Sequence, residues 1–277
     1  MAAQGFWEIR HPDDLTTLAA DWKDTLAGTL NAFRPRPDVI DGQRGLFIDI
    51  GTHVGFYSFL FAAHNYSVLA IEPMPRNRLA ITATLCLNPH LGSRITLVPT
   101  AIGLRRATCV LRAFHEFDGN GELDCTANAT CRDTRPADDY SDHPCARRIC
   151  VCDTVTSMPL DEVLSAHVPD KRRYSTIVAK VDVEGHECQV LESGKDLFRR
   201  LHVDYLQMEL LRPASQRCFR WQAAAHGYEI GAGLGHDNNT VMRRGTRRRG
   251  AGGGSDWRAR TTAARLALTA AAEMVTQ

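Results

Sequence analysis

The sequence lacks any apolar run long enough to cross a bilayer. Among its 277 residues, no stretch reaches the roughly 18 consecutive apolar residues that mark a transmembrane helix. The N-terminus also lacks the basic start and apolar core of a secretory signal peptide. We therefore expect no transmembrane segment. These absences leave the compartment unknown, with the cytoplasm slightly preferred.

Most of the chain also lacks an excess of positive charge. The net charge is +1, and residues 243–277 alone hold eight arginines against two acidic residues. Residues 1–242 are therefore net acidic, which gives no reason to expect a nucleic-acid partner. The Arg-, Gly- and Ala-rich composition of residues 243–277 is typical of a disordered tail.

The nine cysteines include no pair separated by two residues. Zinc ribbons and fingers normally contain such a pair, so no metal site is predicted. Five cysteines fall between Cys125 and Cys152, within an apparent insertion at about residues 104–153. For the cysteines of this insertion, local disulfides, a metal site completed by His143 and incidental cysteines all remain open. Tripeptides that begin at Asn65, Asn128 and Asn238 match the N-glycosylation pattern, which short sequences often match by chance.

The three-glycine fingerprint of dinucleotide-binding proteins is incomplete. A short apolar run, residues 46–50, predicts a buried strand, and helical spacing from Gly55 predicts a helix packed on it. His53 stands where the second glycine of the fingerprint would be. Asp49 precedes Gly51 by two residues. A carboxylate there would repel a pyrophosphate but suits a ligand that carries an ammonium and a sulfonium group.

A second apolar strand, residues 67–71, also ends in an acid. In doubly wound folds, an acid roughly 20 residues after the glycine turn accepts hydrogen bonds from ribose hydroxyls, and Glu72 fits that place. Pro73 stops the strand. A helix is predicted from residue 76 to residue 87, and its pattern is marked by Leu79, Thr82, Ala83 and Leu85.

Further elements are expected along the chain. The predicted strands are 95–99, 176–183 and 203–210, followed by two antiparallel strands at 228–230 and 240–242. Helices are expected between residues 13 and 30, at 159–164, from Gly185 onward and at 217–226. In the helix that begins at Gly185, we expect Cys188, Leu191 and Leu197 to face inward. Residues 104–153 are interpreted mainly as a loop, with Cys109–Leu111 as a possible strand.

Charged residues follow the apolar part of the strand at 176–183. If this strand persists to Glu184, alternation places Lys180, Asp182 and Glu184 on one face. Burying three charges unpaired would be costly, so they either pair or face a ligand. Glu209 ends the following strand and could line the same region. His186 is expected in the first turn of a helix rather than as a base.

These motifs resemble the FkbM-type S-adenosylmethionine-dependent methyltransferases. The resemblance covers about residues 46–210 and is carried by Phe47 to Gly51, Gly55 to Ser58, Ile71 to Pro73, Asn88, Ala101 to Gly103, and most specifically Lys180 to Glu187. It implies a Rossmann-like class I α/β fold, with a seven-stranded mostly parallel sheet and helices on both faces. The expected organisation is a helical extension at 1–44, a methyltransferase domain at 45–242 and the tail at 243–277.

The resemblance also implies S-adenosyl-L-methionine as cofactor and O-methylation of a hydroxyl on a small molecule or glycan. The cofactor-binding candidates are Asp49, Gly51, Gly55, Glu72, Thr100 and Ala101. The catalytic candidates are Asp182, Glu184 and Lys180, since an oxygen acceptor needs a base within hydrogen-bond reach. Two alternatives stay open: a nicotinamide-dependent oxidoreductase, and a non-catalytic binding protein on the same fold. The acceptor and the oligomeric state are not predicted.

Overall fold

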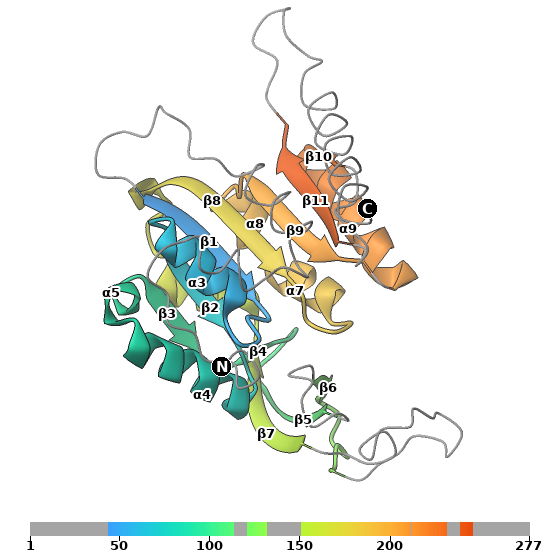
Figure 1. Ribbon diagram of the computed structural model, residues 1–277. Coiled ribbons are helices and arrows are strands. Elements are labelled where there is room, and N and C mark those ends of the chain that lie inside the picture. Colours follow the sequence, from blue (N-terminus) through green and yellow to red (C-terminus); the bar gives the residue numbers. More distant parts are fainter. Residues whose placement is uncertain (1–43, 114–120, 132–150, 211, 232–238, 246–277) are drawn as a thin grey trace, which may run out of the picture.

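The computed structural model describes residues 44–113, 121–131, 151–210, 212–231 and 239–245 (Figure 1). The predicted N-terminal helix and the part of the predicted tail beyond residue 245 lie outside these ranges. The same holds for Cys145, Cys150 and Asn238. No helix in the described ranges is long and apolar enough to span a membrane.

A seven-stranded sheet forms the centre of the molecule, in the order β10-β11-β9-β8-β1-β2-β3. Its strands are β1 (Arg44–Ile50), β2 (Ser67–Ile71), β3 (Ile95–Val98), β8 (Tyr174–Val181), β9 (Tyr205–Glu209), β10 (Tyr228–Ile230) and β11 (Asn239–Arg244). The pairs from β3 to β9 are parallel, and β11 runs antiparallel to both β9 and β10. The predicted α/β class with a mostly parallel, Rossmann-like sheet is confirmed.

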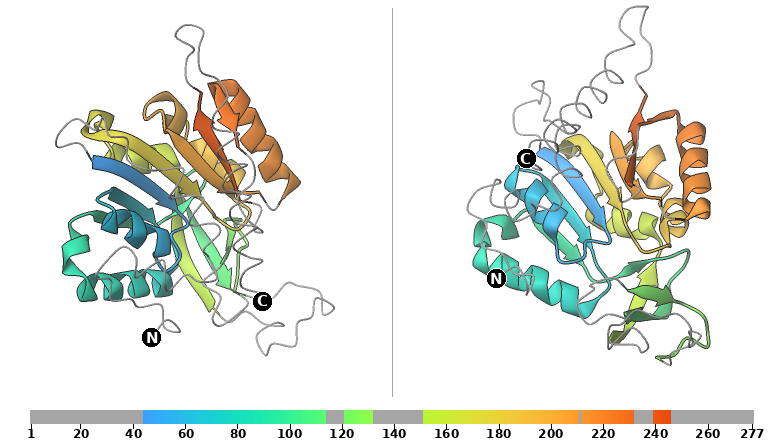
Figure 2. Two further views of the ribbon diagram at one scale, coloured as in Figure 1. Left: turned by 45° about the horizontal axis from the view of Figure 1, so that its top comes forward. Right: turned by 45° about the vertical axis from the view of Figure 1, so that its right-hand side comes forward.

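Helices cover both faces of this sheet (Figure 2). One face carries α3 (Phe56–Ala63), α4 (Pro75–Leu87) and α5 (Pro89–Gly92), and the other carries α6 (Leu160–His167), α7 (Glu187–Ser193), α8 (Asp196–Arg199) and α9 (Pro213–His226). A short 3₁₀ turn, η3 (Lys171–Arg173), precedes β8. Alternation along β1 explains the two cores: Ile48 and Ile50 pack with α6 to α9, whereas Phe47 packs with α3 to α5. Asp49 therefore lies on the α3 face.

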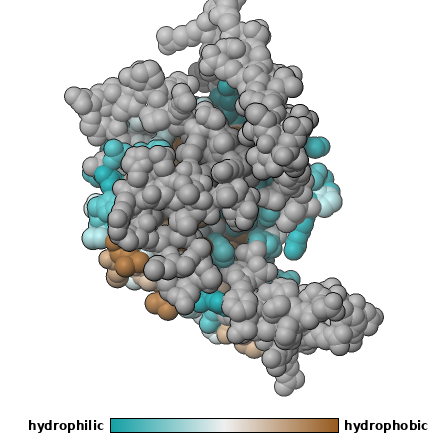
Figure 3. Space-filling model, in the orientation of Figure 1, coloured by the Kyte–Doolittle hydropathy of each residue, from teal (hydrophilic) through white to brown (hydrophobic). Residues whose placement is uncertain are grey.

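The buried face of α4 differs from the predicted one. Its buried residues are Asn77, Ala80, Ile81 and Thr84, whereas Leu79 is 67% exposed. The reason is a polar contact: the Asn77 side-chain amide donates to Glu72, which turns that face of the helix inward. Leu79 and Leu87 remain on the surface, in the region of α4 where Figure 3 shows a brown area at the lower left.

The predicted loop at 104–153 contains strands that the sequence did not indicate. A second sheet has the order β4-β7-β5-β6, formed by β4 (Ala101–Ile102), β5 (Ala107–Ala113), β6 (Glu122–Asp124) and β7 (Val151–Met158). It lies beyond the carboxyl ends of the central strands (Figure 1). The possible strand at Cys109–Leu111 is confirmed as part of β5. We did not predict β7, because its threonines, serine and aspartate hide the alternation that buries Val155.

Among the described residues, three disulfides join cysteines that are distant in sequence. Cys109 pairs with Cys125, Cys131 with Cys152, and Cys188 with Cys218. In the described part of the chain, only the exposed Cys86 is free. The open question about the insertion is thus decided in favour of disulfides for its described cysteines. Leu191 and Leu197 face inward as predicted, but Cys188 is only half-buried and is bonded to α9.

The beginning of the predicted tail belongs to the sheet. Arg243 and Arg244 are the last residues of β11, and each pairs with an acid. Arg243 lies 2.9 Å from Glu229, and Arg244 lies 2.8 Å from Asp204. The expected boundary at residue 243 therefore falls too early by at least these two residues.

Candidate functional site

The turn between β1 and α3 lies close to the backbone that follows β8. Gly51 has a φ of +82°, and a Cβ there would overlap the carbonyl oxygen of Asp182, the residue that follows β8. Gly55 has a φ of +94° and precedes α3, where a Cβ would meet the Phe59 ring. Both glycines are thus required by the fold itself. Their predicted role beside a cofactor stays a prediction.

Asp49 is buried below this turn with one oxygen unsatisfied. Its Oδ2 accepts a hydrogen bond of 2.7 Å from the Ser58 hydroxyl. Among the described residues, its Oδ1 has no hydrogen-bond partner, although Asp49 is only 1% exposed. Burial raises the pKa of Asp49 to about 6, against the opposing charge of Lys180. An unpaired buried acceptor at this position is where an ammonium group would be stabilised.

Glu72 connects the loops that follow β1 and β2. Its Oε2 accepts the backbone N–H of His53 at 2.8 Å, and its Oε1 accepts the backbone N–H of Met74 at 2.9 Å. The amide of Asn77 adds a bond of 3.3 Å to Oε1. Burial raises the pKa of Glu72 to about 7, although these hydrogen bonds oppose the shift. A carboxylate oxygen can accept two hydrogen bonds, so Oε2 retains capacity for a ligand hydroxyl.

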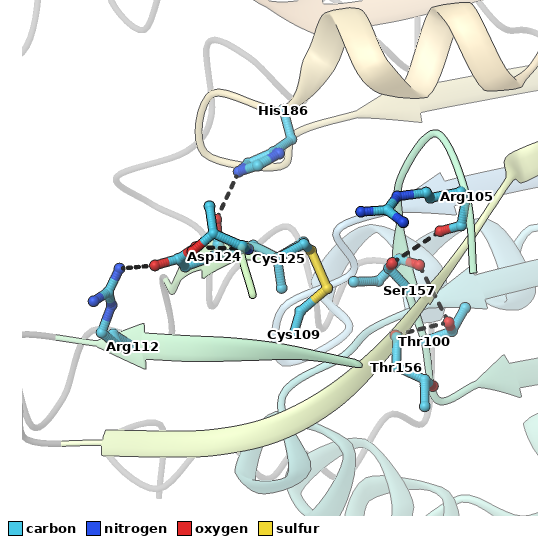
Figure 4. The surroundings of a disulfide bond; sticks show 12 residues. Thr100, Arg105, Cys109, Arg112, Asp124, Cys125, Thr156, Ser157 and His186 are labelled. Atoms are coloured by element: carbon cyan, nitrogen blue, oxygen red, sulfur yellow. Dashed lines mark hydrogen bonds and ion pairs between the residues drawn. A yellow bond between two sulfur atoms is a disulfide. The ribbon is translucent and has the colours of Figure 1, made fainter. Parts of the chain in front are cut away.

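Thr100 and Ala101 are buried where the chain passes from β3 to the second sheet. The Thr100 hydroxyl lies 3.0 Å from the Thr156 carbonyl oxygen and 3.1 Å from that of Ala101 (Figure 4). It therefore joins β4 to β7. Any cofactor contact here would come from backbone atoms or apolar surface. The assignment of both residues to a cofactor site stays a prediction.

A polar row crosses the α3 face of the central sheet. Asp49, Lys180 and Gln207 are in register on β1, β8 and β9. Lys180 is buried, and its Nζ lies 2.9 Å from Asp182 Oδ2 and 5.2 Å from the centre of the Tyr57 ring. Burial alone would lower the pKa of Lys180, but the carboxylates of Asp182 and Asp49 outweigh it and raise the pKa. Lys180 is thus a permanent cation beneath the site.

Three carboxylates converge at the ends of β8 and β9. The strand predicted at 176–183 ends earlier, at Val181, and the condition that it persists to Glu184 is not met, because Glu184 has a φ of +52°. This turn still brings the carboxylates together: one oxygen each of Asp182, Glu184 and Glu209 lies within 4.8 Å of the others. Such a group could hold a cation. Lys180 already supplies a positive charge to Asp182. The predicted absence of a metal stays a prediction.

Two acids of this group, Asp182 and Glu209, have opposite pKa shifts. Burial tends to raise the pKa of Asp182, but the charge and hydrogen bond of Lys180 bring it below its usual value. For Glu209, burial and the charges of Asp182 and Glu184 raise the pKa to about 7. One carboxylate is thus fixed as an anion, while its neighbour titrates near neutral pH. Opposite shifts in adjacent groups are typical of functional sites.

The second sheet reaches both sides of this region. The His186 ring Nε2 lies 3.1 Å from the Leu123 carbonyl oxygen, so the β5–β6 hairpin contacts the loop after β8 (Figure 4). On the other side, a Cβ on Gly121 would approach the Met74 side chain to 2.9 Å. The hairpin therefore spans from the Glu72 loop to the loop after β8. Apart from the length of the insertion, nothing in the sequence indicated this contact.

Helix α7 is anchored immediately behind the carboxylates. The buried Glu187 accepts the Gly185 N–H at 2.7 Å and the Ser215 hydroxyl at 2.7 Å. The disulfide between Cys188 and Cys218 fixes the same two helices, α7 and α9. We did not predict these supports, although Glu187 and Cys188 both lie next to the charged motif. They hold the turn that carries Asp182 and Glu184.

The sheet order and the acids at the ends of β1 and β2 define a Rossmann-like protein of the methyltransferase class. The methyltransferase FkbM domain matches residues 49–230, well over half of the chain. The chain therefore belongs to the FkbM methyltransferase family, and the predicted resemblance is confirmed. A comparison with curated protein sequences gave no match.

Solved structures show similar folds at low identity. Methyltransferase FkbM from Methylobacillus flagellatus is 14% identical, with 75% of this chain and 46% of that chain covered and a TM-score of 0.45. The human methyltransferase 10 domain containing protein is 12% identical, with coverages of 83% and 94% and a TM-score of 0.44. The chain thus spans less than half of the Methylobacillus protein.

S-adenosylmethionine is the cofactor that membership of this family implies. The buried residues fit that cofactor. The unpaired Oδ1 of Asp49 suits its ammonium group, and Oε2 of Glu72 can accept from a ribose hydroxyl. The absence of a middle glycine and the buried acid beside the turn both disfavour a pyrophosphate at this position.

Proposed function

We propose that the chain transfers a methyl group from S-adenosylmethionine to a hydroxyl group of a small molecule or glycan. The observation that supports this most directly is the pair formed by Asp182 and Glu209. A hydroxyl acceptor must lose its proton, which calls for a base within hydrogen-bond reach. A carboxylate whose pKa is about 7 is suited to that task at neutral pH.

In this proposal, Glu209 is the general base. The catalytic candidates Lys180, Asp182 and Glu184 then support Glu209 and do not take the proton themselves. Lys180 is buried and remains charged, so it cannot accept a proton. It stabilises Asp182 as an anion, which makes Asp182 a weaker base than Glu209. The negative charges of Asp182 and Glu184 raise the proton affinity of Glu209 and can orient the acceptor hydroxyl.

On the cofactor side, we assign Asp49 to the methionine ammonium group and Glu72 to the ribose. S-adenosylmethionine supplies an electrophilic methyl group when bound. The protein's own task is then to align the acceptor oxygen and to exclude water, which can supply much of the acceleration. We assign Gly51 and Gly55 to the turn beside the cofactor, and Thr100 and Ala101 to its adenine side.

Calorimetry with purified full-length protein tests the cofactor. We expect S-adenosylhomocysteine to bind and to raise the melting temperature, because a ligand at 100 times its Kd stabilises the native state by about 2.7 kcal/mol. NAD is the control ligand. Binding of NAD without binding of S-adenosylhomocysteine would overturn the proposal in favour of a nicotinamide enzyme.

The base is tested by Glu209→Gln, which keeps the shape of the side chain and removes its charge. The matched control is Glu229→Gln at an exposed position of β10. Acceptors are first found by incubating hydroxyl-bearing small molecules and glycans with methyl-labelled S-adenosylmethionine. We expect turnover to fall by about two to four orders of magnitude in Glu209→Gln, with S-adenosylhomocysteine affinity within a few fold of the parent.

The pH dependence gives a second readout for the same residue. A base must be deprotonated to act, so the parent rate should rise with pH through the pKa of Glu209, at about 7. That rise should be absent from the residual activity of Glu209→Gln. Methylation by this variant at the parent rate would show that another group takes the proton. Labelling of nitrogen or sulfur acceptors alone would refute the hydroxyl assignment.

A further inference from the structure

Six of the described cysteines form three disulfides, at sequence separations of 16, 21 and 30 residues. Each pair joins different elements or loops, so the pairing is a property of the tertiary structure. Structural disulfides of this kind form and persist in oxidising compartments, whereas cytosolic thiols are kept reduced. The paired cysteines therefore favour maturation in an oxidising compartment over the cytoplasm.

The loop after β6 is closed by two of these disulfides. It contains the tripeptide Asn128-Ala129-Thr130, between Cys125, which pairs with Cys109 on β5, and Cys131, which pairs with Cys152 on β7. Within the loop, the Ala129 N–H donates to the Thr126 carbonyl oxygen at 3.1 Å. The tripeptide thus lies on an ordered turn that is tied to the second sheet.

Both acceptor-motif residues of this turn face solvent. Asn128 and Thr130 are exposed, and Asn128 makes no side-chain hydrogen bond to another described residue. The turn is held from below instead: Asp124 accepts the Thr126 N–H at 3.0 Å, and Arg112 donates to the Thr130 carbonyl oxygen at 3.3 Å. A bulky group on the Asn128 amide would therefore extend into solvent without displacing a packed side chain.

The matching tripeptide at Asn65 has a different environment. The Asn65 side-chain oxygen accepts a hydrogen bond of 2.9 Å from Arg94. Its neighbour Tyr66 is 5% exposed, and Ser67 begins the central strand β2. Asn65 is exposed like Asn128, but its side chain is hydrogen-bonded and the rest of its motif enters an inner strand of the central sheet. The motif at Asn65 therefore serves as a matched negative control for the motif at Asn128.

We propose that Asn128 is an N-linked glycosylation site on a chain that matures in an oxidising compartment. The co-reactant is a lipid-linked oligosaccharide pyrophosphate. The Asn128 amide nitrogen forms a bond to the anomeric carbon of the sugar, the bond from that carbon to the pyrophosphate oxygen breaks, and the amide proton passes to the base of the oligosaccharyltransferase. The lipid pyrophosphate is the leaving group. The acceptor pattern Asn-x-Thr is the one that this reaction requires.

The test is translation of the full chain, behind a cleavable leader, in the presence of eukaryotic microsomes. Parent, Asn128→Gln and Asn65→Gln proteins are compared before and after amidase release of N-glycans, and the occupied asparagine is identified by mass spectrometry. We expect a glycan on Asn128 in the parent and in Asn65→Gln, and its loss in Asn128→Gln. Translocated protein that carries no glycan on Asn128, or carries one on Asn65 alone, would overturn the site.

The compartment is tested separately with purified protein. Free thiols are alkylated without reduction, and the cross-linked peptides are mapped. In protein refolded with a glutathione redox buffer, we expect Cys86 to be alkylated. We expect the cross-linked peptides to show the three described disulfides. The matched sample is refolded in excess dithiothreitol and should melt several degrees lower. Equal melting temperatures in the two samples would show that the fold needs no disulfides and would remove the argument for an oxidising compartment.

Discussion

Replacement of Lys180 by methionine should destabilise the protein in a pH-dependent way. Methionine keeps much of the buried stem and removes the cation, which leaves Asp182 and the buried Asp49 without their positive partner. Removing one partner of a buried ion pair costs about 3–5 kcal/mol. Because the Asp182 side chain is 31% exposed, we expect the lower end of that range.

The direction of the pH effect follows from the carboxylates. In the parent, the lowered pKa of Asp182 contributes stability above the unfolded pKa of 3.8, and this contribution is lost as the pH falls through the folded pKa. The raised pKa of Lys180 keeps its contribution fully present below 10.5. Without Lys180, both aspartates resist ionisation. The deficit of the variant should therefore already be present near pH 5, where the parent keeps the contribution of Asp182. It should grow toward pH 7–8, where the unfolded aspartates are ionised and the folded variant resists their ionisation.

The assay is thermal unfolding of Lys180→Met and of the parent at pH 5 and pH 8, at equal ionic strength. A loss of about 3 kcal/mol corresponds to roughly 6–12 °C in Tm for a domain of this size. The matched control, Lys195→Met, changes an exposed lysine and should leave Tm within about 1 °C. An equal deficit at both pH values would refute the electrostatic account and reduce Lys180 to a packing residue.

Three further perturbations have defined outcomes. Glu72→Gln should weaken S-adenosylhomocysteine binding by about 10- to 100-fold in calorimetry, because hydrogen bonds to a charged group contribute about 1.5–3 kcal/mol; unchanged affinity would place the ribose elsewhere. Joint replacement of Cys188 and Cys218 by serine should cost about 3–4 kcal/mol in denaturant unfolding, as expected for a loop of 30 residues. Gly51→Ala should lower the free energy of unfolding by about 1–3 kcal/mol through backbone strain, and further through overlap of the new Cβ with the Asp182 carbonyl oxygen. Gly92→Ala is the control, because a Cβ there meets nothing within 4 Å, and an equal loss in both variants would contradict this account.

The sequence was sufficient for the central sheet and for the acids at its edge. Residues 46–50 and 67–71 are short apolar runs, with Asp49 near the end of the first and Glu72 directly after the second. Because the two strands pair in parallel, these acids lie at the same edge of the sheet. These predictions succeeded because the signal is local: period, length and a stop at glycine or proline. The pattern of α4 failed because the contact of Asn77 with Glu72, not hydropathy, decides which face is buried.

The sequence indicated only that Glu209 could line the region of Asp182, and it did not indicate the role of base that we propose for Glu209. Twenty-seven positions separate it from Asp182 in the printed chain, and only the parallel pairing of β8 with β9 brings the two together. The pKa of Glu209 depends on that proximity and on burial. The motif at residues 180–184 showed that charges emerge at one strand end, but it could not show which carboxylate Lys180 would stabilise.

By itself, the sequence determined the order of the central-sheet strands along the chain, the position of the glycine turn and the family-defining charged motif. The tertiary structure decided which distant residues meet: the cysteine partners, the second sheet with its contact from Leu123 to His186, and the group of three carboxylates. The physical reason is that hydrophobic period and chain breaks act over a few residues, whereas burial and charge coupling depend on neighbours in space.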